Sequence, residues 1–221
     1  MDFFMKNSKF YLPEHRAIQD KFGTGALADK QEELIVHDVF TNAEIEFIST
    51  RDMFFLSTLN SRGEPTVSYK GGPVGFIKVI DNELIFSNYD GNGMFLSVGN
   101  LVKNGKVGLL FIDFETPRRL RVQGVALIDE QPDLQIFPEA EFLIRIKPTD
   151  IWVNCPRYIH TYKKVSQSPY TPGRNSTPRL AQWKRLDSVY ECLLPIDKKA
   201  VENSGQITLD QYNLMISKNE G

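Results

Sequence analysis

The sequence has few cysteines and histidines and no long apolar run. Of its 221 residues, two are cysteine and three are histidine. Cys155 and Cys192 lack the paired spacing of a zinc site and are too few for a disulfide scaffold, which favours a reducing compartment. No apolar run approaches the roughly 20 residues that a transmembrane helix needs. Residues 1–9 lack the apolar core and cleavage site of a signal peptide, so we expect a cytoplasmic protein.

The chain also lacks an excess of charge of either sign. Lys and Arg number 26 and Asp and Glu number 28, which gives a formal net charge of −2. Broad binding to nucleic acid or to an anionic membrane needs a large positive field, so the composition argues against both partners. Neither the P-loop nor the dinucleotide-binding glycine motif occurs. With 41% hydrophobic residues, a chain of this length can bury a core without disulfide or metal crosslinks.

The pattern of apolar residues predicts a mainly β protein with flanking helices. Turn residues bound short apolar or alternating runs, which are typical of strands; these runs are residues 53–59, 65–70, 76–80, 84–88, 107–113, 120–128 and 142–153. One helix interrupts them, because Met94, Val98, Leu101 and Val102 share one helical face and Asn104-Gly105 ends the pattern. Six or seven short strands in hairpins with one crossover helix predict a closed or nearly closed antiparallel barrel.

Further helices are predicted before and after the barrel. Pro13 can start a helix that continues to residue 28. Capping boxes at residues 41–44 and 208–211 predict helices over 42–50 and up to about residue 217. Residues 180–189 also have a helical pattern, and the proline-containing stretch 166–178 predicts a loop. We therefore expect one domain in three parts: a helical extension (1–50), the barrel (51–165) and a loop with helices that pack on it (166–221).

Two glycine-containing stretches could hold an anion. In residues 68–75, SYKGGPVG, glycines allow close backbone approach and Lys70 adds a positive charge; a tight turn with an exposed lysine is the simpler interpretation. Residues 87–93, SNYDGNG, lead into the predicted helix at residue 94, whose N-terminus would attract phosphate. A turn that caps this helix is an equally good interpretation.

Two further stretches concentrate polar side chains. In residues 117–124, PRRLRVQG, an extended strand directs Arg119 and Arg121 to one face, where they suit phosphate or carboxylate unless they pair with acids on a neighbouring strand. Residues 154–160, NCPRYIH, combine a thiol, a guanidinium, a phenol and an imidazole. The other histidines and cysteine lie far away in the sequence, so a full zinc ligand set is not expected. Cys155 with His160 as its base is conceivable, but packing is the favoured role of Cys155.

Together and in this order, these stretches resemble the pyridoxamine 5′-phosphate oxidase-like family of flavin-binding split barrels. The similarity covers roughly residues 15–190 and is greatest to a subgroup of uncharacterised flavin-nucleotide-binding proteins. Its segments are residues 54–76, 84–101, 107–113, 119–126 and 154–160. The resemblance implies an FMN-binding split β-barrel that forms a homodimer with two flavins at the subunit interface and acts on a small-molecule substrate. The near-neutral charge, as above, argues against nucleic acid and membrane as partners.

The resemblance also implies site residues. Ser87, Tyr89 and Asn92 match the segment that holds the phosphate end of FMN, Lys78 matches a family lysine, and Arg119 lies where the oxidase proper has a flavin-contacting glutamine. The full set expected at the cofactor is Ser68, Tyr69, Lys70, Lys78, Ser87, Tyr89, Asn92, Arg119 and Arg157, with His160 at the substrate.

Departures from the family pattern distinguish this chain from the vitamin B6 oxidase proper. Asn92-Gly93 replaces an Arg-Lys pair, and Pro73 replaces an arginine. We expect Lys70, Arg119 or Arg157 from either subunit to compensate, because a phosphate dianion needs cations or several N–H donors. The C-terminal tryptophan- and arginine-containing motif of the oxidase proper is matched only weakly, at residues 181–186. The expected function is therefore an FMN-dependent oxidoreductase of unknown substrate; the alternatives are a flavin carrier or sensor, and a deazaflavin- or haem-binding barrel in which His160 would bind the haem.

Overall fold

The computed structural model describes residues 8–172 and 179–218. The chain divides into two compact units, residues 1–165 and 166–221. Most of the segment 1–9 that was assessed for a signal peptide lies outside the described residues. The same is true of residues 173–178 of the predicted loop, whereas residues 166–172 contain no helix or strand. Among the residues that the structure describes, no helix combines the length and the apolar composition of a membrane span.

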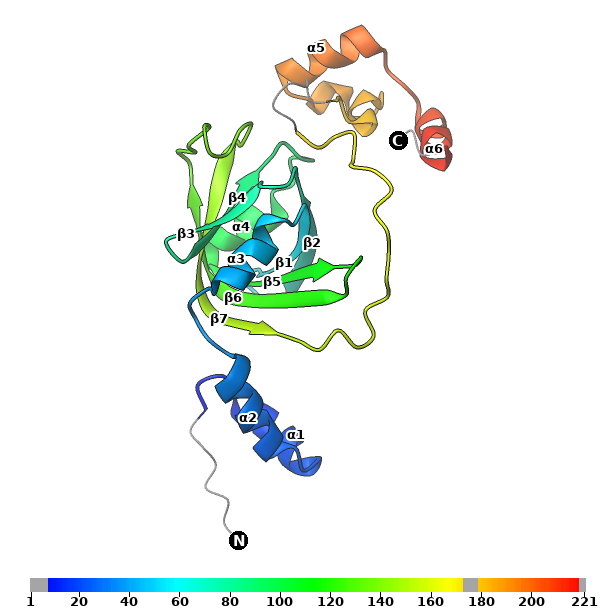
Figure 1. Ribbon diagram of the computed structural model, residues 1–221. Coiled ribbons are helices and arrows are strands. Elements are labelled where there is room, and N and C mark those ends of the chain that lie inside the picture. Colours follow the sequence, from blue (N-terminus) through cyan, green and yellow to red (C-terminus); the bar gives the residue numbers. More distant parts are fainter. Residues whose placement is uncertain (1–7, 173–178, 219–221) are drawn as a thin grey trace. The chain divides into compact units, whose positions relative to one another are not determined.

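The first unit is built on one antiparallel sheet of seven strands. Their order is β2-β1-β5-β6-β7-β4-β3, and the sheet curls into a barrel that is split between its edge strands β2 and β3 (Figure 1). The strands are β1 (Met53–Leu59), β2 (Pro65–Gly71), β3 (Ile77–Ile80), β4 (Glu83–Asn88), β5 (Lys106–Asp113), β6 (Arg118–Asp129) and β7 (Phe142–Val153). The predicted split barrel is thus confirmed, with every predicted strand present.

Alternation along the strands separates a buried inner face from an outer face. In β1, Phe54, Leu56 and Thr58 are buried and their neighbours are partly exposed. The Phe54 ring lies 5.0 Å from Phe86 and 5.2 Å from Phe111, centroid to centroid. Full burial of such a side chain contributes about 1.5–3 kcal/mol to stability. This aromatic cluster therefore fixes which faces of β1, β4 and β5 point inward.

A register shift between β6 and β7 lets these long strands bend. It occurs between Gln123 and Gly124, and a Cβ atom on Gly124 would lie 2.5 Å from the carbonyl oxygen of Lys147. Only glycine allows this close approach of the two backbones. The shift therefore increases the local twist, as a barrel requires, while the two longest strands remain paired on either side of it.

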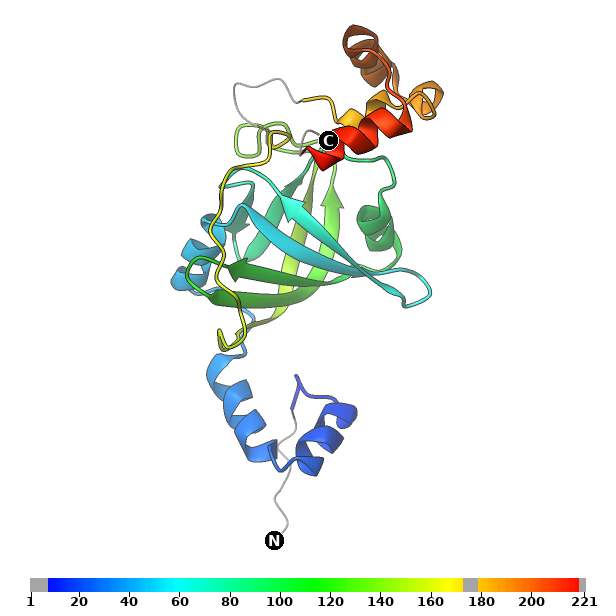
Figure 2. The ribbon, with the colours of Figure 1, turned by 90° about the vertical axis from the view of Figure 1, so that its right-hand side faces the viewer.

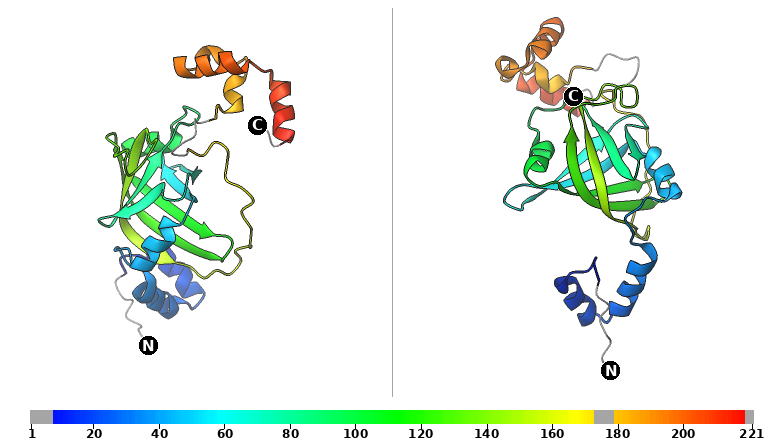
Figure 3. Two further views of the ribbon diagram at one scale, coloured as in Figure 1. Left: turned by 45° about the horizontal axis from the view of Figure 1, so that its top comes forward. Right: turned by 90° about the vertical axis from the view of Figure 1, so that its left-hand side faces the viewer.

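Helices α3 (Asn42–Ser49) and α4 (Leu96–Lys103) lie on opposite sides of the barrel (Figures 2 and 3). The predicted capping box of α3 is present, because the Thr41 side chain accepts a hydrogen bond from the Glu44 backbone. The apolar stripe predicted for α4 is wrong. Leu101 is its one buried residue, and Met94 and Val102 are 62% and 76% exposed.

The reason for this error is local. Phe95, just before α4, has a left-handed backbone (φ 48°), so the helix begins two residues later than predicted. Its polar side chains then face the sheet, where Asn100 Nδ2 donates to Thr58 Oγ1 over 2.9 Å. As a result, most apolar side chains around the start of α4 remain exposed.

The N-terminal segment forms two helices instead of the single helix predicted over residues 14–28. They are α1 (Pro13–Lys21) and α2 (Gly25–Ile35), and the break contains Gly23, whose positive φ of 66° suits glycine. Arg16 joins the two helices through an ion pair with Asp29 at 2.6 Å. This segment also contacts the barrel, since the ring of Phe10 meets that of Trp152 edge-on at 5.2 Å.

The second unit contains α5 (Pro195–Ser204), α6 (Leu209–Ser217) and two short 3₁₀ helices, η1 (Gln182–Arg185) and η2 (Tyr190–Cys192). The helix predicted over residues 180–189 is wrong, because the chain turns extended at Leu186, which forms a parallel bridge with Ile207. Lys184 is buried and lies 3.0 Å from the Asp197 carboxylate. The Thr208 cap of α6 is present as predicted.

Candidate functional site

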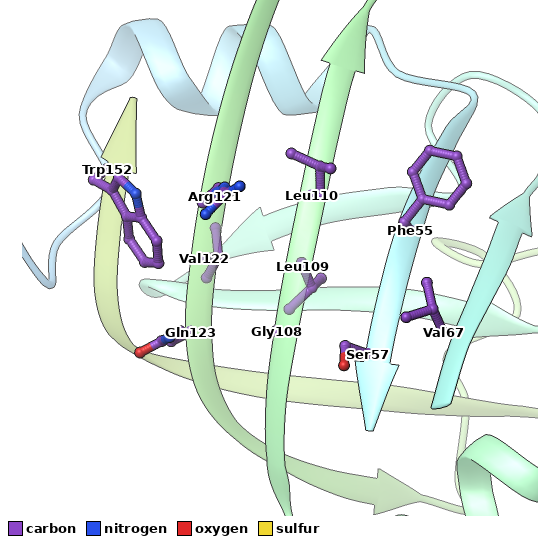
Figure 4. A pocket seen from close by; sticks show the side chains of 10 residues that line it. All are labelled: Phe55, Ser57, Val67, Gly108, Leu109, Leu110, Arg121, Val122, Gln123 and Trp152. Carbon is purple, nitrogen blue, oxygen red and sulfur yellow. The ribbon is translucent and has the colours of Figure 1, made fainter. Parts of the chain in front are cut away.

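A groove of about 330 Å³ lies on the outer face of the barrel (Figure 4). It crosses strands β2, β1, β5, β6 and β7, which are consecutive in the sheet. Apolar side chains dominate its lining, and Arg121 and Gln123 add polar groups. The lining residues are Phe55, Ser57, Val67, Gly108, Leu109, Leu110, Arg121, Val122, Gln123 and Trp152.

Small residues opposite one another create the hollow. Gly108 pairs with Ser57 on one side and with Gln123 on the other. A Cβ atom on Gly108 would meet only Ser57, at 3.9 Å, within 4 Å. Phe55 and Leu110 are the next pair along the strands and carry large side chains on the same face. The outer face therefore has a depression at Gly108, and large apolar side chains flank this depression. Such a shape suits a flat apolar ligand.

Arg119 and Arg121 lie on this outer face, as the strand pattern predicts, while Leu120 and Val122 are buried. The Arg121 guanidinium is 6.0 Å from the Trp152 ring centre, and the two residues are paired across β6 and β7. Arg119 is partly buried. Its Nε atom is buried and has no hydrogen-bond partner among the described residues. Neither arginine has an acidic partner in that part of the chain, so the expected pairing with acids on a neighbouring strand is not found.

Ser68 and Lys70 lie on the other face of the sheet. In register, Lys70 is paired with Phe54 and Ser68 with Leu56, which both belong to the core. The Ser68 hydroxyl oxygen lies 3.1 Å from that of Ser97 in the first turn of α4. Burial lowers the pKa of the Lys70 ammonium. Within the described chain, Lys70 has no acidic partner.

Tyr69, between them, is 63% exposed on the outer face, where its ring meets that of Phe55 edge-on at 6.1 Å. Burial of its hydroxyl, with the nearby Asp52 carboxylate, raises the pKa of Tyr69. Tyr69 extends the aromatic surface of the outer face beyond Phe55.

Lys78, Ser87 and Tyr89 form a third group. Lys78 pairs with Ile85 across β3 and β4, and Ser87 follows two residues later on the same face. Ser87 is buried. Burial raises the pKa of Tyr89, and the neighbouring Ser87 hydroxyl lowers it by a smaller amount. Asn92 lies in the exposed turn that follows, and its side-chain oxygen accepts a hydrogen bond from the Met94 backbone.

The segment after β7 crosses one end of the barrel. Lys164 pairs with Asp52 just before β1, and the Tyr162 backbone donates to Phe114 beyond β5. Arg157 and His160 on this segment are exposed. Cys155 is also exposed, so its predicted packing role is wrong: the chain has left the sheet after Val153 and covers neither side of this thiol. No cluster of three or more metal-ligating side chains occurs among the described residues.

The predicted site residues therefore occupy separate surfaces of one chain. Arg119 lies on the outer face of β6, whereas Lys70 points from β2 toward the core side, and β1 and β5 separate these strands. One small phosphate within one subunit cannot contact both. Phe55, Leu110 and Trp152 were not predicted as site residues. Their outward position in otherwise alternating strands was the only signal in the sequence.

The chain is similar to several solved structures and matches one family model. Three similar solved structures are HupZ of Group A Streptococcus (18% identity, TM-score 0.42, 52% of this chain and 94% of that chain), the haem storage protein HutZ of Vibrio cholerae (21%, 0.36, 47% and 85%) and an FAD binding protein of Mycobacterium smegmatis (16%, 0.37, 52% and 97%). No curated protein matches the sequence. A family model described as pyridoxamine 5′-phosphate oxidase matches residues 40–155.

Proposed function

The chain belongs to the pyridoxamine 5′-phosphate oxidase family, whose model spans 116 of its 221 residues, and on that premise we propose that it is an FMN-binding oxidoreductase for a small-molecule substrate. The observation that carries this proposal is the outer groove, whose mainly apolar lining includes Arg121, a guanidinium that lacks an acidic partner among the described residues. Its two free, exposed cysteines fit the reducing, cytoplasmic compartment that we propose for it.

The groove fits the ring system of a flavin. Its volume of about 330 Å³ lies within the range of about 300–1,000 Å³ that is usual for ligand pockets. Phe55 and Leu110 offer flat apolar surface, and Arg121 and Trp152 bound one side (Figure 4). When bound, the flavin would supply the redox chemistry. The residues of the groove would orient the ring and exclude water from one of its faces.

Lys70 is the residue we propose as the main phosphate cation. Its ammonium is partly buried, and Lys70 shares its face of β2 with Ser68, whose hydroxyl lies 3.1 Å from that of Ser97 at the start of α4. A phosphate there would restore a charge partner to Lys70 and accept hydrogen bonds from both serines. This arrangement would compensate for Asn92-Gly93 and Pro73, which stand where the oxidase proper carries cations. Lys78 and Arg157 are further candidates.

We propose that the flavin sites are completed in a homodimer. Lys70 and the groove face different sides of the sheet in one chain, so a ligand that uses both must lie between two subunits. Exposed apolar side chains around α4 and β2, among them Phe95, Leu96 and Val67, supply surface that such an interface would cover. His160, exposed beyond β7, is our candidate for a substrate contact.

Identification of the cofactor tests the proposal. The purified protein should show the absorbance bands of oxidised flavin, and mass spectrometry of the released cofactor should identify FMN. Reduced nicotinamide should bleach the flavin bands if the protein is a reductase; a flavin that no donor reduces would instead indicate a carrier or sensor. A Soret band without flavin, or a protein that binds no flavin after incubation with excess FMN, would contradict the proposal.

A further inference from the structure

Two buried polar atoms near the groove have no hydrogen-bond partner among the described residues. They are Nε of Arg119, a donor, and Oδ1 of Asn154, an acceptor. Most buried polar groups in proteins are hydrogen-bonded, and leaving one unsatisfied costs free energy. Two such atoms, one on β6 and one directly after β7, therefore indicate a group that these residues do not supply.

The strand register places these residues next to each other. Arg121 pairs with Trp152 and Leu120 with Val153. Arg119 and Asn154 are the next residues beyond this last pair, and Asn154 lies directly after the end of β7. Alternation puts Arg119 on the outer face, because Leu120 between the arginines is 1% exposed and points to the core. Asn154 follows Val153, the last paired residue of β7, and its Oδ1 atom is buried. Arg121 and Trp152, one step along, line the groove. Arg119 and Asn154 therefore lie two residues along the chain from Arg121 and Trp152, which line one end of the groove.

The chemistry of the pair restricts the ligand. Nε–H of Arg119 needs an acceptor, and Oδ1 of Asn154 needs a donor. A phosphate dianion offers acceptors alone and would place negative oxygens against the Asn154 oxygen. An imide edge, in which a carbonyl and an N–H are adjacent, satisfies both atoms at once. The pyrimidine end of a flavin carries such an edge, at its N3–H and the carbonyls on either side.

We propose that Arg119 and Asn154 bind the pyrimidine end of the flavin ring, which assigns Arg119 to the ring and not to the phosphate. This inference rests on the proposed function. It adds Asn154 as a specificity-determining residue and fixes the direction of the ring, with its pyrimidine end toward the end of β7.

Flavins that lack a phosphate test the assignment. Wild type, Arg119→Ala and Asn154→Leu are titrated with FMN, riboflavin, lumiflavin and N3-methyl-lumiflavin, and fluorescence quenching gives the affinities. Arg119→Ala should weaken the first three ligands equally, by about 10-fold or more, because a charge-assisted hydrogen bond is lost. Asn154→Leu should weaken them by about 5-fold.

The N3-methyl ligand isolates the contact with Asn154. Wild type should bind it about 5-fold or more weakly than lumiflavin, because the methyl group removes the donor. Asn154→Leu should bind the two ligands equally, and Asn154→Asp, which keeps an acceptor, should restore the preference for lumiflavin. Arg118→Ala is the matched control: it removes a guanidinium one residue away that lies 5.1 Å from the Phe47 ring centre, and it should leave all four affinities unchanged.

The outcomes separate this inference from the proposed function. If wild type binds FMN but Arg119→Ala and Asn154→Leu bind lumiflavin as tightly as wild type, the ring assignment is overturned and the flavoprotein remains. Selective loss of FMN over riboflavin in Arg119→Ala would also overturn it, in favour of a phosphate contact. If wild type binds no flavin at all, both proposals fall.

Discussion

Lys70 carries the phosphate end of the proposed site, and its surroundings predict opposite effects on stability and binding. Its ammonium is partly buried without an acidic partner among the described residues. Lys70→Met keeps the aliphatic chain and removes the charge, so it should weaken FMN by roughly 10- to 150-fold and leave riboflavin affinity unchanged. The cofactor-free variant should melt at or above the wild-type temperature, because a desolvated charge is gone. Calorimetric titration and thermal melts measure the two effects, and equal weakening of both ligands would contradict the phosphate role.

Asp113 predicts a dependence of stability on pH. Burial raises the pKa of its carboxyl, but hydrogen bonds from Thr116 and Glu115 and the Arg51 guanidinium outweigh this and lower it overall. A lowered pKa stabilises the fold above the unfolded-state value of about 3.9, and this stabilisation is lost as the pH falls through the folded value. Asp113→Asn should lower the free energy of unfolding by about 1–2 kcal/mol at pH 7.

Urea unfolding at several pH values measures this effect. The difference between wild type and Asp113→Asn should narrow below about pH 4. Asp38→Asn, at an exposed carboxylate with no side-chain partner among the described residues, should follow wild type throughout. A gap that stays constant down to pH 2 would show that the charge of Asp113 is not the cause.

At the scale of elements, the capping boxes of α3 and α6 form a natural comparison. Thr41 caps α3, and Glu44 of the same box is buried and also lies 3.0 Å from His37 Nε2. Thr41→Ala should therefore lower the stability of the barrel by about 1–2 kcal/mol. Thr208→Ala removes the same cap from α6, which buries no residue, and should reduce helix content while leaving barrel unfolding unchanged. Equal effects of both variants on barrel unfolding would contradict this assignment.

The sequence predicted elements well where the signal is local. Alternation and turn residues predicted β1 and β7 with the bounds that the structure has, and Thr41 and Thr208 marked their helices correctly. The apolar stripe predicted for α4 was wrong, because helical spacing cannot show that Ser97 and Asn100 face the sheet. Helix α5 went unpredicted because its one buried residue, Val201, leaves no apolar stripe.

The site was less predictable for a related reason. Strand alternation was enough to place Arg119 and Arg121 on one face. The pairing of Arg121 with Trp152, or of Gly108 with Ser57, depends on which strands pair and in which register. Such pairings join residues far apart in the sequence, and no local pattern encodes them. The expected cofactor therefore came from resemblance to a family, whereas the neighbours of each side chain could be identified only in the structure.

At the scale of the whole molecule, a flavin site that takes Lys70 from one subunit and the groove from the other predicts a dimer in which two inactive variants complement each other. Sedimentation should give about twice 25.3 kDa. Lys70→Ala and Leu110→Glu should each lose FMN, but mixed and re-equilibrated subunits should recover about a quarter of the sites, since half the dimers are mixed and each holds one intact site.

The complementation experiment needs two controls. Both variants must sediment as dimers before mixing, and each variant alone, taken through the same procedure, should recover no site. A mixture that recovers nothing would show that one chain supplies both Lys70 and the groove. A monomer that binds FMN tightly would contradict the dimer itself.

The strand order also determines how the barrel can assemble over time. Pairs β1–β2, β3–β4, β5–β6 and β6–β7 join consecutive strands, whereas β1–β5 and β4–β7 join residues about 50 and 60 positions apart, as in Phe55 with Leu110 and Leu84 with Ile146. Closing these long loops costs chain entropy before the strand contacts that would offset this cost have formed. The β5–β6–β7 meander should therefore form early and act as a template, onto which the two hairpins dock from either side in the slow step of folding.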